Sequence, residues 1–287
     1  MNGFIAAVSL LPKPMRVSAD AIPREQLATA SEFRLRRGLP PTVLLTDCEL
    51  RMNENPVTRQ DLYRILDSAC QSSPYVMKQC VAQGYVIAPG GVRVGVCGQM
   101  NSGENGEYTL TELTSLAIRI PRQVIGCADK IHIEPFHSTL ILSPPGCGKT
   151  TLLRDMIRRL SDCGHRIGLC DERGEVAAVC HGEVGFHVGR CTDVMSGMPK
   201  AQSAMAILRS MNPQILAMDE ITAPADVEAC AMAANCGVQL LATAHAASLD
   251  ELQNRELYRR LMGTSAFHKI IRITLDKGQR NYEESVL

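Results

Sequence analysis

Residues 140–151 constrain the fold of this chain more than any other stretch of the sequence. An apolar run ends in a loop of proline and glycine, and a helical pattern follows, which is the strand–loop–helix context of a phosphate-binding loop. Ser143 stands where that motif begins with glycine, and a chance turn before a Lys-Thr pair is the alternative. The residues expected to bind a nucleotide are Ser143, Pro144, Pro145, Gly146, Cys147, Gly148, Lys149, Thr150 and Thr151.

Lys149, Thr150 and Asp219 carry the chemistry expected of such a loop. Backbone N–H groups and the N-terminus of the following helix favour an anion. Lys149 adds a point charge for the β- and γ-phosphates of ATP, and the Thr150 hydroxyl is a ligand for Mg²⁺. Asp219 ends an apolar run at 215–218, where phosphate-loop enzymes place an acid that holds the Mg²⁺ shell. We therefore predict ATP and Mg²⁺ as ligands, with Thr150 and Asp219 as the metal residues.

Two glutamates compete for the role of general base. Glu220 directly follows Asp219 and can polarise an attacking water. Glu172 follows a second expected strand, within the acidic run 171–175, and is the rival base. The structural alternatives are a solvated acidic turn for the first and a capping, salt-bridged turn for the second.

A histidine and an arginine complete the catalytic candidates. His245 follows the expected strand at 238–242, where it can sense the γ-phosphate or relay its presence to a neighbouring subunit. A lone histidine is more often structural. Arg209 precedes the strand that ends at Asp219, and its planar guanidinium suits phosphate oxygens.

The cysteines favour neither disulfides nor a metal site. The sequence has 12 of them with no repeated spacing, as expected for small buried side chains in a reducing cytoplasm. Cys180, His181, His187 and Cys191 match no zinc module, and we expect a mobile loop there. The apolar run at 4–11 is too short to span a bilayer, so we expect a cytoplasmic protein that docks to a membrane partner.

The pattern of apolar residues predicts a smaller α+β domain at 1–125 and an α/β domain at 126–287. From residue 138 onward, short apolar runs alternate with helical patterns, which favours a mostly parallel sheet with helices on both faces and ligands at the carboxyl ends of its strands. The expected strands there are 140–142, 166–170, 214–218, 238–242 and 270–275, and the expected helices are 150–161, 200–209, 225–235 and 249–261. In the first domain the expected strands are 32–37, 42–45, 85–87, 92–96 and 116–120, with helices at 18–29, 58–70 and 73–81 and a polar loop at 101–106.

Composition separates the functional alternatives. The formal net charge is +0, aromatic residues are 4% and tryptophan is absent, so the chain offers little bulk attraction for nucleic acid and few stacking platforms. A nucleic-acid motor or remodeller on the same fold therefore remains the second hypothesis. A nucleotide-gated scaffold that does not hydrolyse ATP is the third, and Lys149, Asp219 and Glu220 together argue against it.

The order and spacing of these motifs resemble the stage III sporulation protein AA family, a branch of the secretion ATPases that power type II and type IV secretion and type IV pili. The resemblance rests on residues 143–151, 171–177, 192–194, 199–200, 208–213, 218–221 and 243–246, and in the N-terminal half on 32–36, 91–95, 118–120 and 126–130.

This resemblance implies a RecA-like core in a homo-hexameric ring that hydrolyses ATP to drive a channel between mother cell and forespore. The channel proteins would be the membrane-embedded partners, and the chain would lie on the mother-cell side. Lys149 and Thr150 then belong to the Walker A loop, Asp219 and Glu220 to Walker B, and His245 to the histidine box. Secretion ATPases also place arginines that act on a neighbouring subunit's site at the end of the N-terminal domain. Arg119 and Arg122 occupy that region here, and a structural salt bridge is their alternative role.

Overall fold

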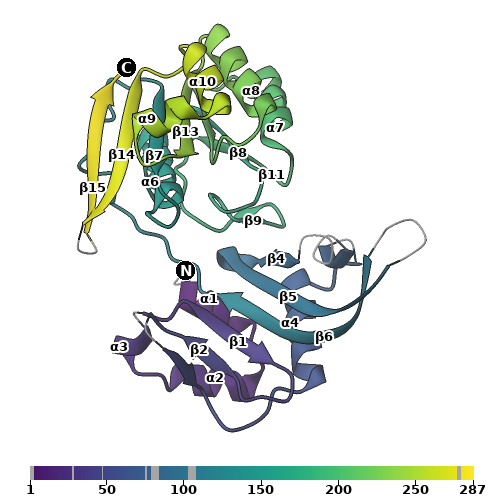
Figure 1. Ribbon diagram of the computed structural model, residues 1–287. Coiled ribbons are helices and arrows are strands. Elements are labelled where there is room, and N and C mark those ends of the chain that lie inside the picture. The colour runs from purple at the N-terminus through teal and green to yellow at the C-terminus, as the bar shows by residue number, and fades with distance from the viewer. Residues whose placement is uncertain are drawn as a thin grey trace. The chain divides into compact units, whose positions relative to one another are not determined.

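The computed structural model divides the chain into two compact units (Figure 1). Unit 1 comprises Met1–Gln123 and Ala178–Gly185, and unit 2 comprises Val124–Ala177 and Phe186–Leu287. None of the helices in the described part of the chain is long and apolar enough to cross a membrane. The described residues are 3–27, 29–46, 48–74, 76–78, 84–102, 108–276 and 279–287.

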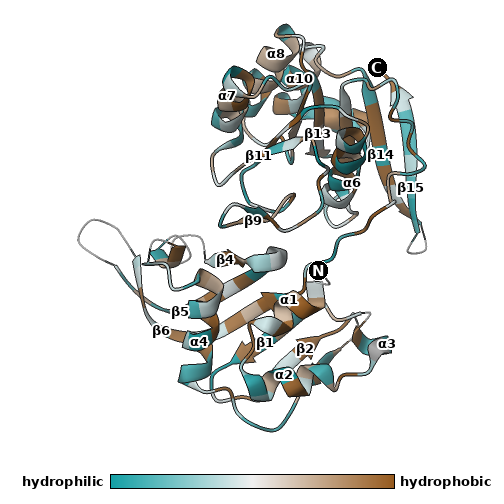
Figure 2. Ribbon diagram, turned by 180° about the vertical axis from the view of Figure 1, so that it is seen from behind, coloured by the Kyte–Doolittle hydropathy of each residue, from teal (hydrophilic) through white to brown (hydrophobic). Residues whose placement is uncertain are grey.

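Unit 1 is built on a six-stranded antiparallel sheet. Its strands are β1 (Glu32–Arg36), β2 (Thr42–Leu44), β3 (Glu49–Arg51), β4 (Tyr85–Ala88), β5 (Val92–Ser102) and β6 (Tyr108–Arg119), in the order β3-β2-β1-β6-β5-β4. The helical elements are α1 (Gly3–Ser9), α2 (Lys13–Asp20), α3 (Arg24–Leu27), α4 (Arg59–Cys70) and the 3₁₀ turn η1 (Pro89–Gly91). Phe33 and Leu35 are fully buried on β1 while Arg34 and Arg36 are not, because side chains alternate across a strand. Apolar residues of α1 and α4 pack with these strands in one core, on the face that Figure 2 presents to the viewer.

The segment Ala178–Gly185 forms a short hairpin in unit 1. Its strands are β9 (Val179–Cys180) and β10 (Glu183–Val184), which pair antiparallel. The Cys180 thiol donates to the Ile87 carbonyl oxygen at 3.3 Å. Part of the expected mobile loop is thus regular structure, because its backbone groups pair with each other and the Cys180 side chain bonds to β4.

Unit 2 is a seven-stranded sheet of order β11-β8-β12-β13-β7-β14-β15. Neighbouring strands are parallel except for β15, which runs antiparallel to β14 at one edge. The strands are β7 (Thr139–Ser143), β8 (Ile167–Asp171), β11 (Thr192–Ser196), β12 (Ile215–Met218), β13 (Gln239–His245), β14 (Lys269–Asp276) and β15 (Gln279–Val286). The helices are α6 (Lys149–Asp162), α7 (Lys200–Ser210), α8 (Pro224–Asn235), α9 (Leu249–Asn254) and α10 (Glu256–Gly263).

Helices cover both faces of this sheet. Leu140 and Leu142 of β7 share a core cluster with α7, α8, α9 and α10. Ile141 lies between them in sequence, so it faces the other side, where α6 packs with its buried apolar stripe of Leu152, Leu153, Met156, Ile157 and Leu160. The predicted α/β class, with a parallel sheet between two helical layers, is therefore confirmed.

Several expected elements differ from those observed. The expected helix at 249–261 is two helices, α9 and α10, which break at Arg255, where the backbone is extended. The expected helix at 18–29 is α2 and α3, separated near Pro23, which disfavours the helical conformation at the residue before it. The strand expected at 116–120 is the end of β6, which begins at residue 108.

Other expectations fall partly outside the described residues. The helix expected at 73–81 includes residues 75 and 79–81, and the loop expected at 101–106 includes residues 103–106, and these residues lie outside the described part of the chain. The strands β3, β9, β10, β11 and β15 are not predicted by the sequence. Strands β3, β10 and β15 are mostly exposed, β9 has only two residues, and β11 has no buried side chain, so none shows a clear apolar periodicity.

Candidate active site

The loop between β7 and α6 has a backbone suited to an anion. Gly146 and Gly148 have φ of 77° and 99°, in the left-handed region that glycine adopts without a steric penalty. Gly148 is the N-cap of α6, so the first N–H groups of that helix and the positive end of its dipole face the loop. Ser143, where the motif expects glycine, is fully buried and donates its hydroxyl to the Pro144 carbonyl oxygen at 2.8 Å.

Lys149 is folded back onto its own loop. Its Nζ lies 2.9 Å from the Ser143 carbonyl oxygen, 3.1 Å from that of Pro144 and 2.9 Å from Nδ1 of His245. Burial lowers the pKa of the Lys149 ammonium, while the negative charge of Glu220 opposes that shift. With the Ser143 hydroxyl oxygen at 3.3 Å, the ammonium group therefore has four protein acceptors, all of them at the carboxyl edge of the sheet.

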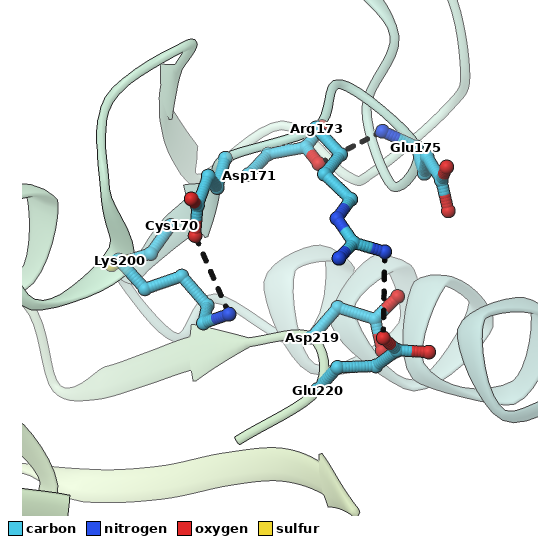
Figure 3. Close-up of a pocket in the computed structure, with 8 residues that line it drawn as sticks. Cys170, Asp171, Arg173, Glu175, Lys200, Asp219 and Glu220 are labelled. Carbon is cyan, nitrogen blue, oxygen red and sulfur yellow. Dashed lines mark hydrogen bonds and ion pairs between the residues drawn. The ribbon is translucent and has the colours of Figure 1, made fainter. Parts of the chain in front are cut away.

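His245 links Lys149 to Glu220. A protonated lysine only donates, so Nδ1 of His245 accepts from it, and Nε2 then donates to Glu220 Oε1 at 2.6 Å. Glu220 has φ of 49°, unusual for a residue with a side chain, and its N–H donates to the Thr243 hydroxyl at 2.8 Å. Arg173 lies 3.6 Å from the other carboxylate oxygen of Glu220 (Figure 3).

Asp219 is held by two hydroxyl groups. Thr150 donates to its Oδ2 at 2.6 Å and Thr243 donates to its Oδ1 at 2.5 Å. A hydroxyl oxygen and a carboxylate oxygen thus lie next to each other beside the phosphate loop. Mg²⁺ in phosphate-transfer sites takes one or two carboxylates together with substrate phosphates, so these residues fit Mg²⁺.

The strand register explains this convergence. Met218 of β12 is level with Cys170 of β8 and with Ala242 of β13, so the next residues, Asp219, Asp171 and Thr243, lie side by side at the carboxyl ends of three strands. The pairing of His245 with Ser143 brings β13 level with the phosphate loop in the same way.

Glu172 lines the same pocket as Asp219 and forms an ion pair with Lys200. Its Oε2 lies 3.4 Å from Nζ of Lys200, which also lies 3.5 Å from Asp226. Lys200 is buried at the start of α7 and lines this pocket (Figure 3). Both candidate bases therefore lie near Asp219, Glu220 bonded to His245 and Glu172 paired with Lys200.

The backbone after Glu172 is fixed by Asp171 and Arg154. Asp171 is buried and accepts from the backbone N–H groups of residues 175–177 at 2.8–3.2 Å. Burial raises the pKa of Asp171, and these N–H groups oppose the shift. Arg154 of α6 donates to the carbonyl oxygens of Val176 and Glu175, each at 2.6 Å. Sequence reasoning missed Arg154, since an arginine in an amphipathic helix is ordinarily solvated.

Three candidate arginines do not contact the loop between β7 and α6 in this structure. Arg209 lies in the last turn of α7, which begins at the pocket with Lys200 and ends at the opposite edge of the sheet, before β12. Arg119 and Arg122 belong to unit 1, where Arg119 pairs with Glu32 at 3.6 Å and Arg122 donates to a backbone carbonyl oxygen. Residues 180–191 contribute no cluster of three metal-ligating side chains, and neither does any other described part of the chain.

One arginine that sequence reasoning missed does reach the loop. Arg280, at the start of β15, donates its Nε to the Cys147 carbonyl oxygen at 2.8 Å. No motif marks it, because the hairpin that carries it is polar and exposed. Only the pairing of β15 with β14 brings it beside the loop.

Comparison with known proteins identifies the family and the fold. A family model described as "Sporulation stage III, protein AA" matches residues 16–282. The chain is 33% identical over 285 residues to the stage III sporulation protein AA of Bacillus subtilis (strain 168), with 94% of this chain and 90% of that protein covered.

Two solved structures share the fold. The pilus retraction motor PilT with bound ADP has a TM-score of 0.64 at 17% identity, with 92% of this chain and 81% of that chain covered. The ATPase DotB of Legionella pneumophila has a TM-score of 0.57 at 15% identity, with 91% and 77% covered. The shared feature is a RecA-like core preceded by a smaller N-terminal part. The match over residues 16–282 and the likeness over nearly the whole B. subtilis protein show that this chain belongs to the stage III sporulation protein AA family.

Proposed function

We propose that this chain is a Mg²⁺-dependent ATPase that hydrolyses ATP to ADP and phosphate. The observation that carries the proposal is the meeting of Lys149, Thr150 and Asp219 at one loop, where Thr150 donates to Asp219 at 2.6 Å. The loop backbone supplies N–H donors, Lys149 supplies a cation, and the two oxygens supply a metal site. The similar structures are named as a motor with bound ADP and as an ATPase, which supports this reading.

Each residue has a role that follows from its position. The loop N–H groups and Lys149 hold the phosphates, while Thr150 and Asp219 hold the metal. Mg²⁺ bound there would neutralise charge that develops on the phosphate oxygens. Glu220 orients and polarises the attacking water, and His245 keeps the Glu220 carboxylate in place through its 2.6 Å contact. Glu172 is the alternative base, with Lys200 as the residue that orients it.

At the cellular level we propose a homo-hexameric motor that drives a secretion-type channel between mother cell and forespore. In this proposal residues 126–287 are the ATPase domain and residues 1–125 contribute to contacts within the ring. The chain lies in the cytoplasm on the mother-cell side, and channel proteins embedded in the membrane are its partners. Arg119 or Arg122 would complete a neighbouring subunit's site, and Arg209 could act only in the same way, from across an interface. The family match supports the sporulation setting.

The proposal is tested by phosphate release at several protein concentrations, with and without single-stranded nucleic acid. We expect Mg²⁺-dependent turnover that rises steeply with concentration and is lost in Lys149→Ala. Turnover that is unchanged in that variant would remove the phosphate loop from the mechanism. Strong stimulation by single-stranded nucleic acid would favour the nucleic-acid motor instead, and nucleotide binding without turnover would favour the scaffold.

A further inference from the structure

The β14–β15 hairpin extends beyond the edge of the sheet that carries the phosphate loop. Arg272 of β14 is level with Leu142 of β7, and β14 continues to Asp276. β7 ends one residue after Leu142, so residues 274–276 of β14 extend past the end of β7 by roughly 10 Å, at about 3.3 Å per residue. The start of β15 therefore lies beside the loop between β7 and α6, past the end of β7.

Arg280 lies on the face of this hairpin that α6 shares. It is directly opposite Leu275, and opposite residues of an antiparallel pair project to the same face. Leu275 in turn alternates with Ile271 and Ile273, which are fully buried, and not with Ile270, which packs with the helices of the other face. Arg280 thus projects toward the start of α6, in agreement with its contact to Cys147.

Gly148 makes room for the Arg280 side chain. A Cβ at Gly148 would lie 2.8 Å from Nε of Arg280 and 3.5 Å from its Cζ, so with any other residue at this position the guanidinium group would have to shift. The arginine therefore lies over the N-terminus of α6. A cation at that end of a helix opposes the helix dipole, and the described residues include no carboxylate partner for Arg280. An anion at the loop would remove this conflict.

The order of the strands shows which end of a nucleotide Arg280 would meet. β7 lies between β13 and β14. Lys149 Nζ, His245, Asp219 and Glu220 all lie on the β13 side, which is the side of the metal and of the general base. Arg280 comes from the β14–β15 side, next to the exposed apolar side chain of Leu275. The two sides of the loop therefore carry different chemistry.

We propose that Arg280 binds the nucleoside end of the substrate, through the phosphate nearest the ribose, on the side of the loop opposite the metal residues. This rests on the proposed function and deepens it, since it assigns a nucleotide contact to the C-terminal hairpin. Leu275 supplies an apolar surface for the nucleoside next to that contact. Arg280 is a binding residue in this assignment and takes no part in the chemical step.

Equilibrium binding of fluorescent ATP and ADP analogues to the full-length chain tests this proposal. Arg280→Gln keeps an N–H donor for the Cys147 carbonyl oxygen but removes the charge. We expect it to weaken ATP and ADP equally, by about five- to tenfold, because both ligands carry the same phosphate next to the ribose. Arg272→Gln is the matched control, since Arg272 is on the same hairpin but pairs with Glu283 at 2.6 Å.

The affinities of the two variants for ATP and ADP distinguish the possible roles of Arg280. Equal weakening of both nucleotides in Arg280→Gln, with wild-type affinity in Arg272→Gln and unchanged thermal unfolding of both, supports the assignment. Wild-type affinity in Arg280→Gln means that the arginine only supports the loop backbone. Weakening of ATP alone means that it meets the γ-phosphate, which also overturns the assignment. If the wild-type chain binds neither nucleotide, the proposed ATPase function fails. This result differs from failure of the Arg280 assignment, in which the wild-type chain still binds both nucleotides.

Discussion

Thr243 is the residue through which the fold positions both acids of the site, and its replacement by valine tests that arrangement. The side chain is fully buried. Its hydroxyl donates to Asp219 at 2.5 Å and accepts from the Glu220 N–H at 2.8 Å. Valine has nearly the same shape without the hydroxyl, so Thr243→Val removes both bonds and leaves the packing of β13 in place.

The expected magnitude follows from these two bonds. A hydrogen bond to a charged group contributes about 1.5–3 kcal/mol and a neutral one about 0.5–1.5 kcal/mol, so we expect the free energy of unfolding to fall by about 2–4 kcal/mol. Asp219 keeps its bond to Thr150 but loses its second support. Loss of a group that orients a metal ligand typically lowers metal affinity or activity by about 10- to 100-fold.

The assay is urea-induced unfolding, combined with the Mg²⁺ concentration that gives half-maximal ATP turnover. Thr139→Val is the matched control, because Thr139 is also buried and lies on the neighbouring strand β7, and its hydroxyl donates to the His137 carbonyl oxygen at 2.6 Å rather than to an acid of the site. We expect that control to lose about 1 kcal/mol and to keep its Mg²⁺ dependence. If Thr243→Val loses no more stability than Thr139→Val, and the Mg²⁺ requirement is unchanged, the hydroxyl does not organise the site.

Three further predictions concern the proposed reaction. Glu220→Gln should keep ATP binding and slow hydrolysis by about 10²–10⁴, as measured by binding and single-turnover assays, and the same result for Glu172→Gln alone would assign the base to Glu172. Cys147, half-buried among loop N–H groups at a helix N-terminus, should be the thiol alkylated first, with loss of activity and protection by ATP. Peptide mass spectrometry would contradict this if other cysteines react while Cys147 stays unmodified. Mixtures of Arg119→Ala and Lys149→Ala chains should regain activity if Arg119 acts across an interface, and mixed rings without any gain would exclude that role.

The positions of the loop before α6 and of Asp219 at the end of β12 could be predicted from sequence because their signals are local. Asp219 directly follows four apolar residues, and Lys149 directly follows a glycine turn. In a parallel sheet, both positions necessarily fall at the carboxyl edge. The α/β class followed from the same alternation of strands and helices, and the structure confirms it.

The supporting residues could not be predicted, because their roles depend on pairing between distant strands. In the sequence, Thr243 is an ordinary β-branched residue of an apolar strand. Its role depends on the register of β13 against β12, which the sequence does not reveal. Arg280 lies in a strand whose side chains are mostly exposed, so no periodicity marked even the strand. The last turn of α7 removes Arg209 from the loop because a helix that connects parallel strands must return to the opposite edge.

His245, at the tip of β13, connects Lys149 of the loop to Glu220. Phosphate binding at the loop would have to replace the contacts of Lys149 Nζ with two carbonyl oxygens and with His245 Nδ1. Once Lys149 Nζ leaves Nδ1, the imidazole keeps its contact with Glu220 through Nε2. Asp219 is held independently by two threonine hydroxyls, so this change need not disturb it. The two neighbouring acids thus differ in physical setting, because Asp219 is held by two threonine hydroxyls and Glu220 is linked through His245 to Lys149.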